Sequence, residues 1–136
     1  MADVSVTAAS VVKTASTAIR AGIAGATITA GQPIYLDSTA SNKAKPADAD
    51  ALATAAVVGI ALNSASDGQP IDYATAGNVT YNSAFTVGQV YVASTNAGGI
   101  APYVDLGSGD YVTILGVATT ATNLKLSINQ SGIAKP

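Results

Sequence analysis

The sequence predicts an all-β domain, mainly antiparallel, folded as a compact β-barrel or β-sandwich. Three observations favour this class. Short runs rich in β-branched residues and tyrosine recur along the chain, each bounded by Gly, Asn, Asp or Ser. The 8 acidic residues are all Asp, and Glu, a good helix former, is absent. The 136 residues are 49% hydrophobic and only 10% charged, whereas soluble domains are typically about 25% charged.

The predicted strands follow one another through most of the chain. A strand at 27–29 leads through a turn at Ala30–Gly31 into a strand at 33–36. Tight turns are expected at Asp67–Gly68 and at 76–78. Alternation of apolar and polar residues in the last strand predicts that Lys125 faces water. The further predicted strands are 57–62, 71–73, 78–81, 90–92, 111–117 and 124–128.

One short surface helix is predicted near 46–55. Pro46 suits a first helical turn, and Asp48 and Asp50 would lie near the positive end of the helix. Leu52 is its one large apolar residue, so the helix would lie on the surface.

The chain divides into an N-terminal arm at 1–20, a β domain at 21–129 and a loose C-terminal tail at 130–136. The first 20 residues have no strong period and few large apolar anchors, so they should pack poorly on their own domain. They form either an extended arm that becomes ordered on a partner or a frayed terminus. Tyrosine is enriched in protein interfaces. Tyr35 and Tyr103 of the β domain are therefore candidate interface residues, together with residues of the arm. The predicted interface residues are Val4, Val6, Val11, Val12, Arg20, Tyr35 and Tyr103.

The two halves of the chain are related by a shift of 57 residues, which indicates an internal duplication. The shift superimposes residues 29–32 on 86–89 and residues 57–61 on 114–118, and it pairs Ile71 with Ile128. About 9 of roughly 46 pairs are identical, where about 4 or 5 are expected at this composition. Residues 68–71 repeat the turn of residues 31–34. Recurrence of similar turns in any β protein is the competing interpretation.

The composition excludes most catalytic chemistry. Without His or Cys, the chain has no catalytic triad, no thiol nucleophile, no His-ligated zinc and no disulfide. Asp48 and Asp50 are better explained by a helix start than by a pair of catalytic carboxylates, and residues 105–110 by a loop between strands than by a calcium site. We therefore expect no enzyme activity, no cofactor and no metal.

Partners of two further classes are also not expected. The net charge is -2 and the six cations are scattered, so no basic surface for nucleic acid is predicted. No apolar run is long enough to span a membrane, and no secretory signal is expected. A core built largely of Ala and Val buries little area per residue. Self-association, or docking on a larger assembly, is the economical expectation.

Three segments carry a resemblance to a known family. They are GATITAGQPIYLD at 25–37, VVGIALN at 57–63 and GQPI at 68–71. In this order they resemble the capsid decoration (cement) proteins of tailed bacteriophages, a family formerly described as a domain of unknown function. The resemblance covers about residues 20–128. The family offers no catalytic residues to carry over.

The resemblance implies a structural protein of the virion. Such a protein would bind the outer surface of an assembled phage head, as a homotrimer on the lattice of the major capsid protein, after assembly in the host cytoplasm. Bridging several shell subunits stabilises the shell, because the protein binds the lattice and not loose subunits. The alternative is a β module of a phage fibre or tail protein that binds carbohydrate or a cell surface.

Overall fold

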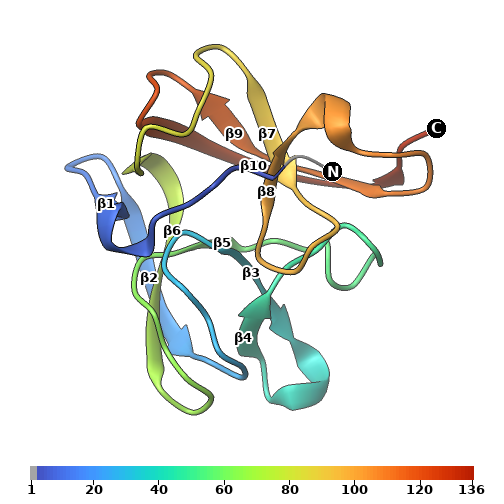
Figure 1. Cartoon of the computed structure of the whole chain (residues 1–136). Helices are drawn as coiled ribbons and strands as arrows, with labels where there is room; N and C mark the ends of the chain where they lie inside the picture. The colour runs from blue at the N-terminus through green and yellow to red at the C-terminus, as the bar shows by residue number, and fades with distance from the viewer. Residues whose placement is uncertain (1–2) are drawn as a thin grey trace.

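The computed structural model describes residues 3–136 and confirms the all-β class. Strands of mainly antiparallel pairing form one continuous, strongly curled sheet (Figure 1). Single turns of 3-10 helix lie at Ala8–Ser10, Ser38–Ala40 and Tyr103–Asp105. The strands are β1 (Val12–Lys13), β2 (Ala18–Ile23), β3 (Pro33–Asp37), β4 (Lys43–Pro46), β5 (Gly59–Ala61), β6 (Pro70–Thr80), β7 (Val90–Ala93), β8 (Ile100–Pro102), β9 (Tyr111–Ala118) and β10 (Asn123–Ala134).

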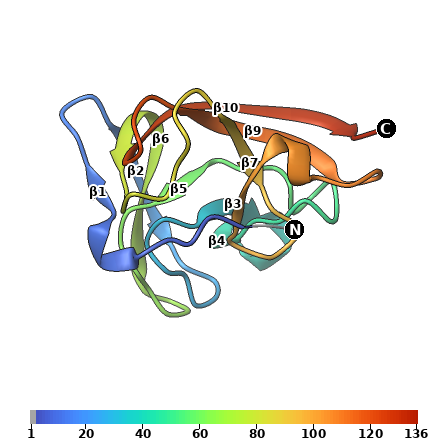
Figure 2. The same ribbon diagram turned by 45° about the horizontal axis from the view of Figure 1, so that its top comes forward.

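The long strand β6 belongs to both halves of the molecule. Its first part pairs with β2 and β5, and its second part pairs with β1 and β10. The first half has the strand order β2-β6-β5-β3-β4, and the second half has the order β6-β10-β9-β7-β8. Each half therefore has the same five-strand arrangement. In chain order, β6 is the last strand of the first half and the first strand of the second half. Figure 2 shows β7, β9 and β10 of the second half above β3 and β4 of the first half, with β6 at the left of both.

The strand registers confirm the duplication. Pro33 pairs with Ile60 in the first half, and Val90 pairs with Val117 in the second, which is a shift of 57 at both positions. The shift fails in the last strand of each half, because residues 62–69 connect β5 to β6 whereas the shorter segment 119–122 connects β9 to β10. The predicted equivalence of Ile71 with Ile128 is therefore wrong.

The repeated Gly-Gln turn is a real structural element. Gly31, Gly68 and Gly88 all adopt positive φ, at 94°, 86° and 82°, a region that glycine enters without the steric cost of a Cβ. The following glutamine closes each turn through its backbone N–H, which donates to the carbonyl three residues earlier at 3.0–3.2 Å. In the first two turns the Gln side-chain oxygen also accepts the N–H of that earlier residue. The recurrence is thus a shared local structure.

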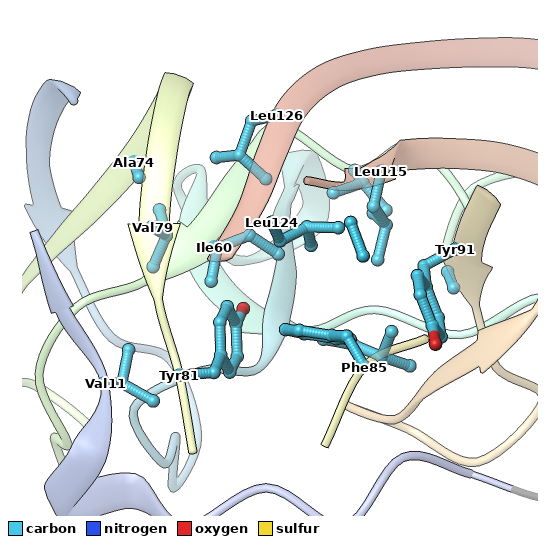
Figure 3. Packing of buried hydrophobic residues seen from close by; sticks show 14 of the residues in the cluster. Val11, Ile60, Ala74, Val79, Tyr81, Phe85, Tyr91, Leu115, Leu124 and Leu126 are labelled. Atoms are coloured by element: carbon cyan, nitrogen blue, oxygen red, sulfur yellow. The ribbon is translucent and has the colours of Figure 1, made fainter. Parts of the chain in front are cut away.

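The largest core cluster lies between the two halves. Tyr81, Phe85 and Tyr91 form its aromatic part, with Phe85 between the two tyrosines in edge-to-face contact at centroid distances of 5.0 and 4.9 Å (Figure 3). The Tyr81 hydroxyl donates to the Gly31 carbonyl at 3.1 Å, which ties the second half to a turn of the first. A smaller cluster of buried apolar residues, which includes Ile28 and Ile34, fills the first half. The core is therefore continuous across the duplicated units.

The predicted helix near 46–55 is wrong. Residues 47–50 form no helix and bend between strands of the two halves: the Ala47 N–H donates to the Pro33 carbonyl and the Ala49 N–H to the Ser94 carbonyl. Ala47 and Ala49 are fully buried, whereas Asp48 is half-buried and Asp50 is exposed. This alternation has the period of a strand. Residues 51–55 form turns, in which the Ala55 N–H donates to the Ala51 carbonyl four residues earlier, as in one turn of an α-helix.

Two further boundaries differ from the prediction. The segment 130–136 is not a loose tail, because β10 continues to Ala134 and pairs with β9, and Lys135 bonds to the backbone at residues 109–110. The turn predicted at 76–78 is also absent, because β6 runs through it. Gly77 has φ of +84° and marks the place where β6 changes partners. Sequence patterns suggested a break there because a strand rarely contains glycine.

Candidate interaction surface

The N-terminal segment is fastened to the chain's own domain, so the prediction of an extended arm is wrong. We call residues 3–17 the N-terminal strap. Val4 N–H donates to the Ile100 carbonyl at 2.7 Å, and the Asn82 side chain bonds to the backbone at Ser5 and Thr7. Asp3 accepts from Ser94 Oγ at 2.6 Å. Sequence reasoning missed these bonds because they join residues far apart in the chain.

Three of the predicted interface residues have a role in folding. Val11 is buried in the main core cluster, and Val4 and Val6 are half-buried against it. Val6 and Val11 also contact the turn at Gly31. These three valines are the few apolar side chains by which the strap packs on the core. They are enough to attach the strap because its hydrogen bonds also hold it against the domain. Their predicted contact with another protein stays a prediction.

β1, which is part of the strap, and β2, which follows it, carry apolar side chains that the domain leaves exposed. Val12 is 52% exposed, Ile19 41% and Ile23 43%. Val12 and Ile19 lie along a shallow groove of about 460 Å³, together with Leu62 and the polar side chains of Lys13, Asn63 and Asp72. Exposed apolar patches beside polar rims are typical of protein contact sites. We call this feature the β1–β2 groove.

The outer edge of β2 is only partly covered. Its inner edge pairs with β6, and directly past Ile23 the chain meets β4, where Ala24 forms a parallel bridge with Ala44 and the Gly25 N–H donates to the Ala44 carbonyl at 2.7 Å. Leu62 N–H donates to the carbonyl of Asp72, so the backbone of Asp72 faces β5. Because pairing directions alternate along an antiparallel ladder, the backbone of Ala21, which is opposite Asp72, faces outward. The N–H and C=O of Ala21 are thus directed away from the sheet.

Arg20, Tyr35 and Tyr103 are not brought together. Arg20 is exposed and lines a separate hollow of about 380 Å³ with Tyr73 and Gln130. Tyr35 is half-buried against the main core. Tyr103 lies on the other half, where the Lys135 ammonium is 4.6 Å from its ring centroid and donates to the Leu106 carbonyl at 2.7 Å. Of these three residues, Arg20 alone lies on β2, the strand that exposes Ile19 and Ile23.

The shorter of the two ion pairs among the described residues lies outside the β1–β2 groove. Lys45 Nζ is 2.8 Å from Asp37 Oδ2 across the β3–β4 pair. The hydrogen bond from Lys45, with two more from Thr39, lowers the pKa of Asp37 to about 2 and raises the pKa of Lys45. Burial raises the pKa of Tyr81 far above its ordinary range. These groups stabilise local structure away from the β1–β2 groove, whose own charged side chains are Lys13 and Asp72.

Residues 3–136 contain neither a cluster of metal-ligand side chains nor a candidate membrane helix. No group of three or more Asp side chains in this range is placed to hold a metal ion. In the same range no helix has the length and apolar character to cross a bilayer. The loop at 105–110 is an ordinary turn, in which the Asp110 carboxylate accepts the Gly107 N–H at 2.8 Å.

Sequence reasoning missed Ile19 and Ile23 as surface residues. The signal that could have found them is the alternation of Ile19, Ala21 and Ile23, which has the period of a strand. A scan of protein families finds no family that matches this chain, and a comparison with curated proteins finds no significant relative.

Proposed function

We propose that the protein is a capsid decoration (cement) protein of a tailed bacteriophage. It binds the outer surface of the assembled head as a homotrimer, contacts the major capsid protein lattice and so becomes part of the virion. The observation that carries the proposal is the β1–β2 groove, where Val12 and Ile19 expose apolar surface on a weakly charged β domain. The segments at 25–37, 57–63 and 68–71 that resemble the family support it further.

The physical logic of this function is linkage. A protein that contacts several shell subunits at once binds the assembled lattice and not the free subunits, so its binding free energy stabilises the lattice. Three copies joined in a ring add their individually weak contacts through high effective concentration. The domain itself needs no moving part or reactive group for this role. A rigid core with an exposed apolar groove is sufficient.

The experiment is a binding assay on bare phage heads. Purified protein is mixed with heads that lack decoration and, in parallel, with a panel of immobilised glycans. Saturable binding to heads at a fixed stoichiometry, with a higher temperature of head disruption, supports the proposal. Selective retention on a glycan without binding to heads would overturn it in favour of a carbohydrate- or cell-surface-binding module.

A matched pair of variants locates the contact. Val12→Lys places a charge in the β1–β2 groove and should weaken binding to heads at least about tenfold, because a buried unpaired charge is costly. Val87→Lys makes the same change at a position that is 64% exposed in a turn of the other half. Its binding should equal that of the original protein. Equal loss in both variants would contradict the assignment of the groove.

A further inference from the structure

A second hollow shares strand β2 with the β1–β2 groove and has a different chemistry. Its volume is about 380 Å³, and its walls come from β2, β3, β6 and β10 and from the segment before β5. Its lining residues are Arg20, Leu36, Val57, Val58, Tyr73, Thr75, Ile128 and Gln130. We call it the Arg20 hollow. Because Ile19 lines the groove and Arg20 lines the hollow, the two features are reached from neighbouring positions of one strand.

Arg20 brings a positive charge to the hollow that no acidic side chain compensates. The lining residues include no Asp, and both ion pairs among residues 3–136 belong to lysines. A guanidinium presents its N–H donors in a planar fork, which matches the two oxygens of a carboxylate. The hollow therefore contains a charged donor group without a partner of opposite charge.

Tyr73 adds a second donor at a fixed position. It is opposite Arg20 in the pairing of β2 with β6, so the two side chains lie on the same face of the sheet. Tyr73 is only 6% exposed, and its ring lies so close to Gly59 that a Cβ there would be 2.6 Å from Tyr73 Cδ2. Its hydroxyl has no hydrogen-bond partner within residues 3–136, yet it is not enclosed, since the one enclosed side-chain atom without a partner in that range is Asn78 Oδ1. The Tyr73 hydroxyl is thus available to donate into the hollow that Tyr73 lines.

The remaining wall of the hollow is largely apolar and fits an aliphatic stem. Leu36, Val58 and Ile128 are half-buried, and Val57 is fully buried. The Gln130 side chain donates to the Val57 carbonyl at 2.7 Å, which fixes β10 against the segment before β5. One cation beside aliphatic side chains suits a single negative charge on a short apolar chain. A phosphate group would bring about two charges and no stem, so the chemistry favours a carboxylate.

The open shape of the hollow favours a carboxylate that belongs to a protein. Pockets for free small molecules bury most of the surface of the ligand, whereas Arg20 and Gln130 are both exposed at the Arg20 hollow. A side chain presented by a larger surface needs no such enclosure, because the surrounding contacts of the interface exclude water from it.

We propose that the Arg20 hollow binds the side-chain carboxylate of an acidic residue on a partner protein. The Arg20 guanidinium donates to both carboxylate oxygens, the Tyr73 hydroxyl donates to one of them, and the aliphatic wall contacts the methylene groups of the stem. The partner is the shell of the proposed function, and in that respect the inference rests on the proposed function. Its first test needs no phage heads, so a failure of the hollow is distinguishable from a failure to bind shells.

The first test is an NMR titration of the protein with sodium propionate, the analogue of a glutamate side chain. At constant ionic strength, propionate should saturably shift the backbone amide signals of Arg20, Val58, Tyr73 and Ile128. Propionamide, which is neutral and has the same shape, should not shift them. Sodium phosphate should bind at least about threefold more weakly, because it has no stem for the apolar wall. Equal shifts with propionamide, equal or tighter binding of phosphate, or no saturable shift up to about 100 mM propionate would overturn the proposal.

Substitutions assign the two donors. Arg20→Gln should weaken propionate binding at least about tenfold, and Arg20→Lys, which keeps the charge without the planar fork, should weaken it less. Tyr73→Phe keeps the ring, removes the hydroxyl and should weaken binding at least about threefold. Lys125→Gln removes the same charge from an exposed position outside the hollow and should bind like the original chain. Unchanged binding in Arg20→Gln, or an equal loss in Lys125→Gln, would overturn the proposal. If Tyr73→Phe does not fold, the two substitutions of the exposed Arg20 decide the outcome.

The second test identifies the source of the carboxylate with the binding assay on bare heads. Arg20→Gln should bind heads at least about tenfold more weakly than the original chain, because it leaves a buried carboxylate unpaired. Lys125→Gln should bind heads like the original chain. Equal binding of Arg20→Gln and the original chain to heads would overturn the assignment to the shell, and propionate shifts would then assign the hollow to a free carboxylic acid. If the original chain itself does not bind heads, the proposed function fails, and the propionate titration still decides whether the hollow binds a carboxylate.

Discussion

The aromatic cluster at the junction of the two halves leads to the sharpest prediction on stability. Phe85 makes edge-to-face contacts with Tyr81 and Tyr91, at centroid distances of 5.0 and 4.9 Å and interplanar angles of 79° and 61°. Each such pair contributes about 0.5–1.5 kcal/mol beyond the area that it buries. Phe85→Leu keeps most of the apolar volume and removes both contacts. The free energy of unfolding should therefore fall by about 1–3 kcal/mol.

The measurement is urea denaturation followed by far-UV circular dichroism and by tyrosine fluorescence, which is usable because the chain has no Trp. Because β6 belongs to both halves and the core is continuous, the variant should still unfold in a single transition with an unchanged slope. Val87→Ala, in an exposed turn, is the control and should change the stability by less than about 0.5 kcal/mol. A loss below about 0.5 kcal/mol for Phe85→Leu, or two separate transitions, would refute the reasoning.

Three further perturbations test other parts of the structure. Gly77→Ala should lower the free energy of unfolding by more than about 2 kcal/mol in urea denaturation, because its Cβ would lie 2.0 Å from the Ser16 carbonyl oxygen and φ is +84°. The pKa of Asp37 is lowered to about 2 by Lys45 and Thr39, so its stabilisation is present above its ordinary value of 3.8 and is lost as the pH falls towards 2. Asp37→Asn should flatten the stability curve over that pH range, and an unchanged curve would contradict this account. Deletion of residues 2–10 should lower the thermal midpoint, because it removes the bonds of the N-terminal strap; an equally stable truncated domain would show that the strap adds nothing to folding.

The duplication was the part of the fold most accessible from the sequence. Its signal lay in turn glycines and the strands beside them, where backbone conformation restricts the residue type, as at Gly31 and Gly88. The same rule failed at Gly77, whose positive φ serves a change of partner within one strand. A glycine pattern identifies an unusual backbone conformation, but it does not say whether the chain turns back or continues. Only the pairing of β6 with strands from both halves decides that.

The interaction surface was less accessible, for a different physical reason. Val11 and Val12 are adjacent and chemically identical, yet one is buried in the core and the other is 52% exposed. Alternation along a strand separates them, but the strand β1 is only Val12–Lys13 and too short to give a readable pattern. The strap is held by bonds from Asn82, Ser94 and Ile100. No local property of the first twenty residues specifies such distant partners.

The duplication explains why the two ends of the sheet are finished in different ways. The two five-strand units share β6, so β2 and the extension of β10 are the strands without an equivalent neighbour in the other unit. Past its end at Ile23, the β2 segment meets β4 through the Ala24–Ala44 bridge and the bond from the Gly25 N–H to the Ala44 carbonyl. The extension of β10 pairs with β9, and its register shifts twice along that pairing. Because bulges oppose the addition of a further strand, one end is closed by pairing within the first unit and the other is guarded by its own irregular backbone.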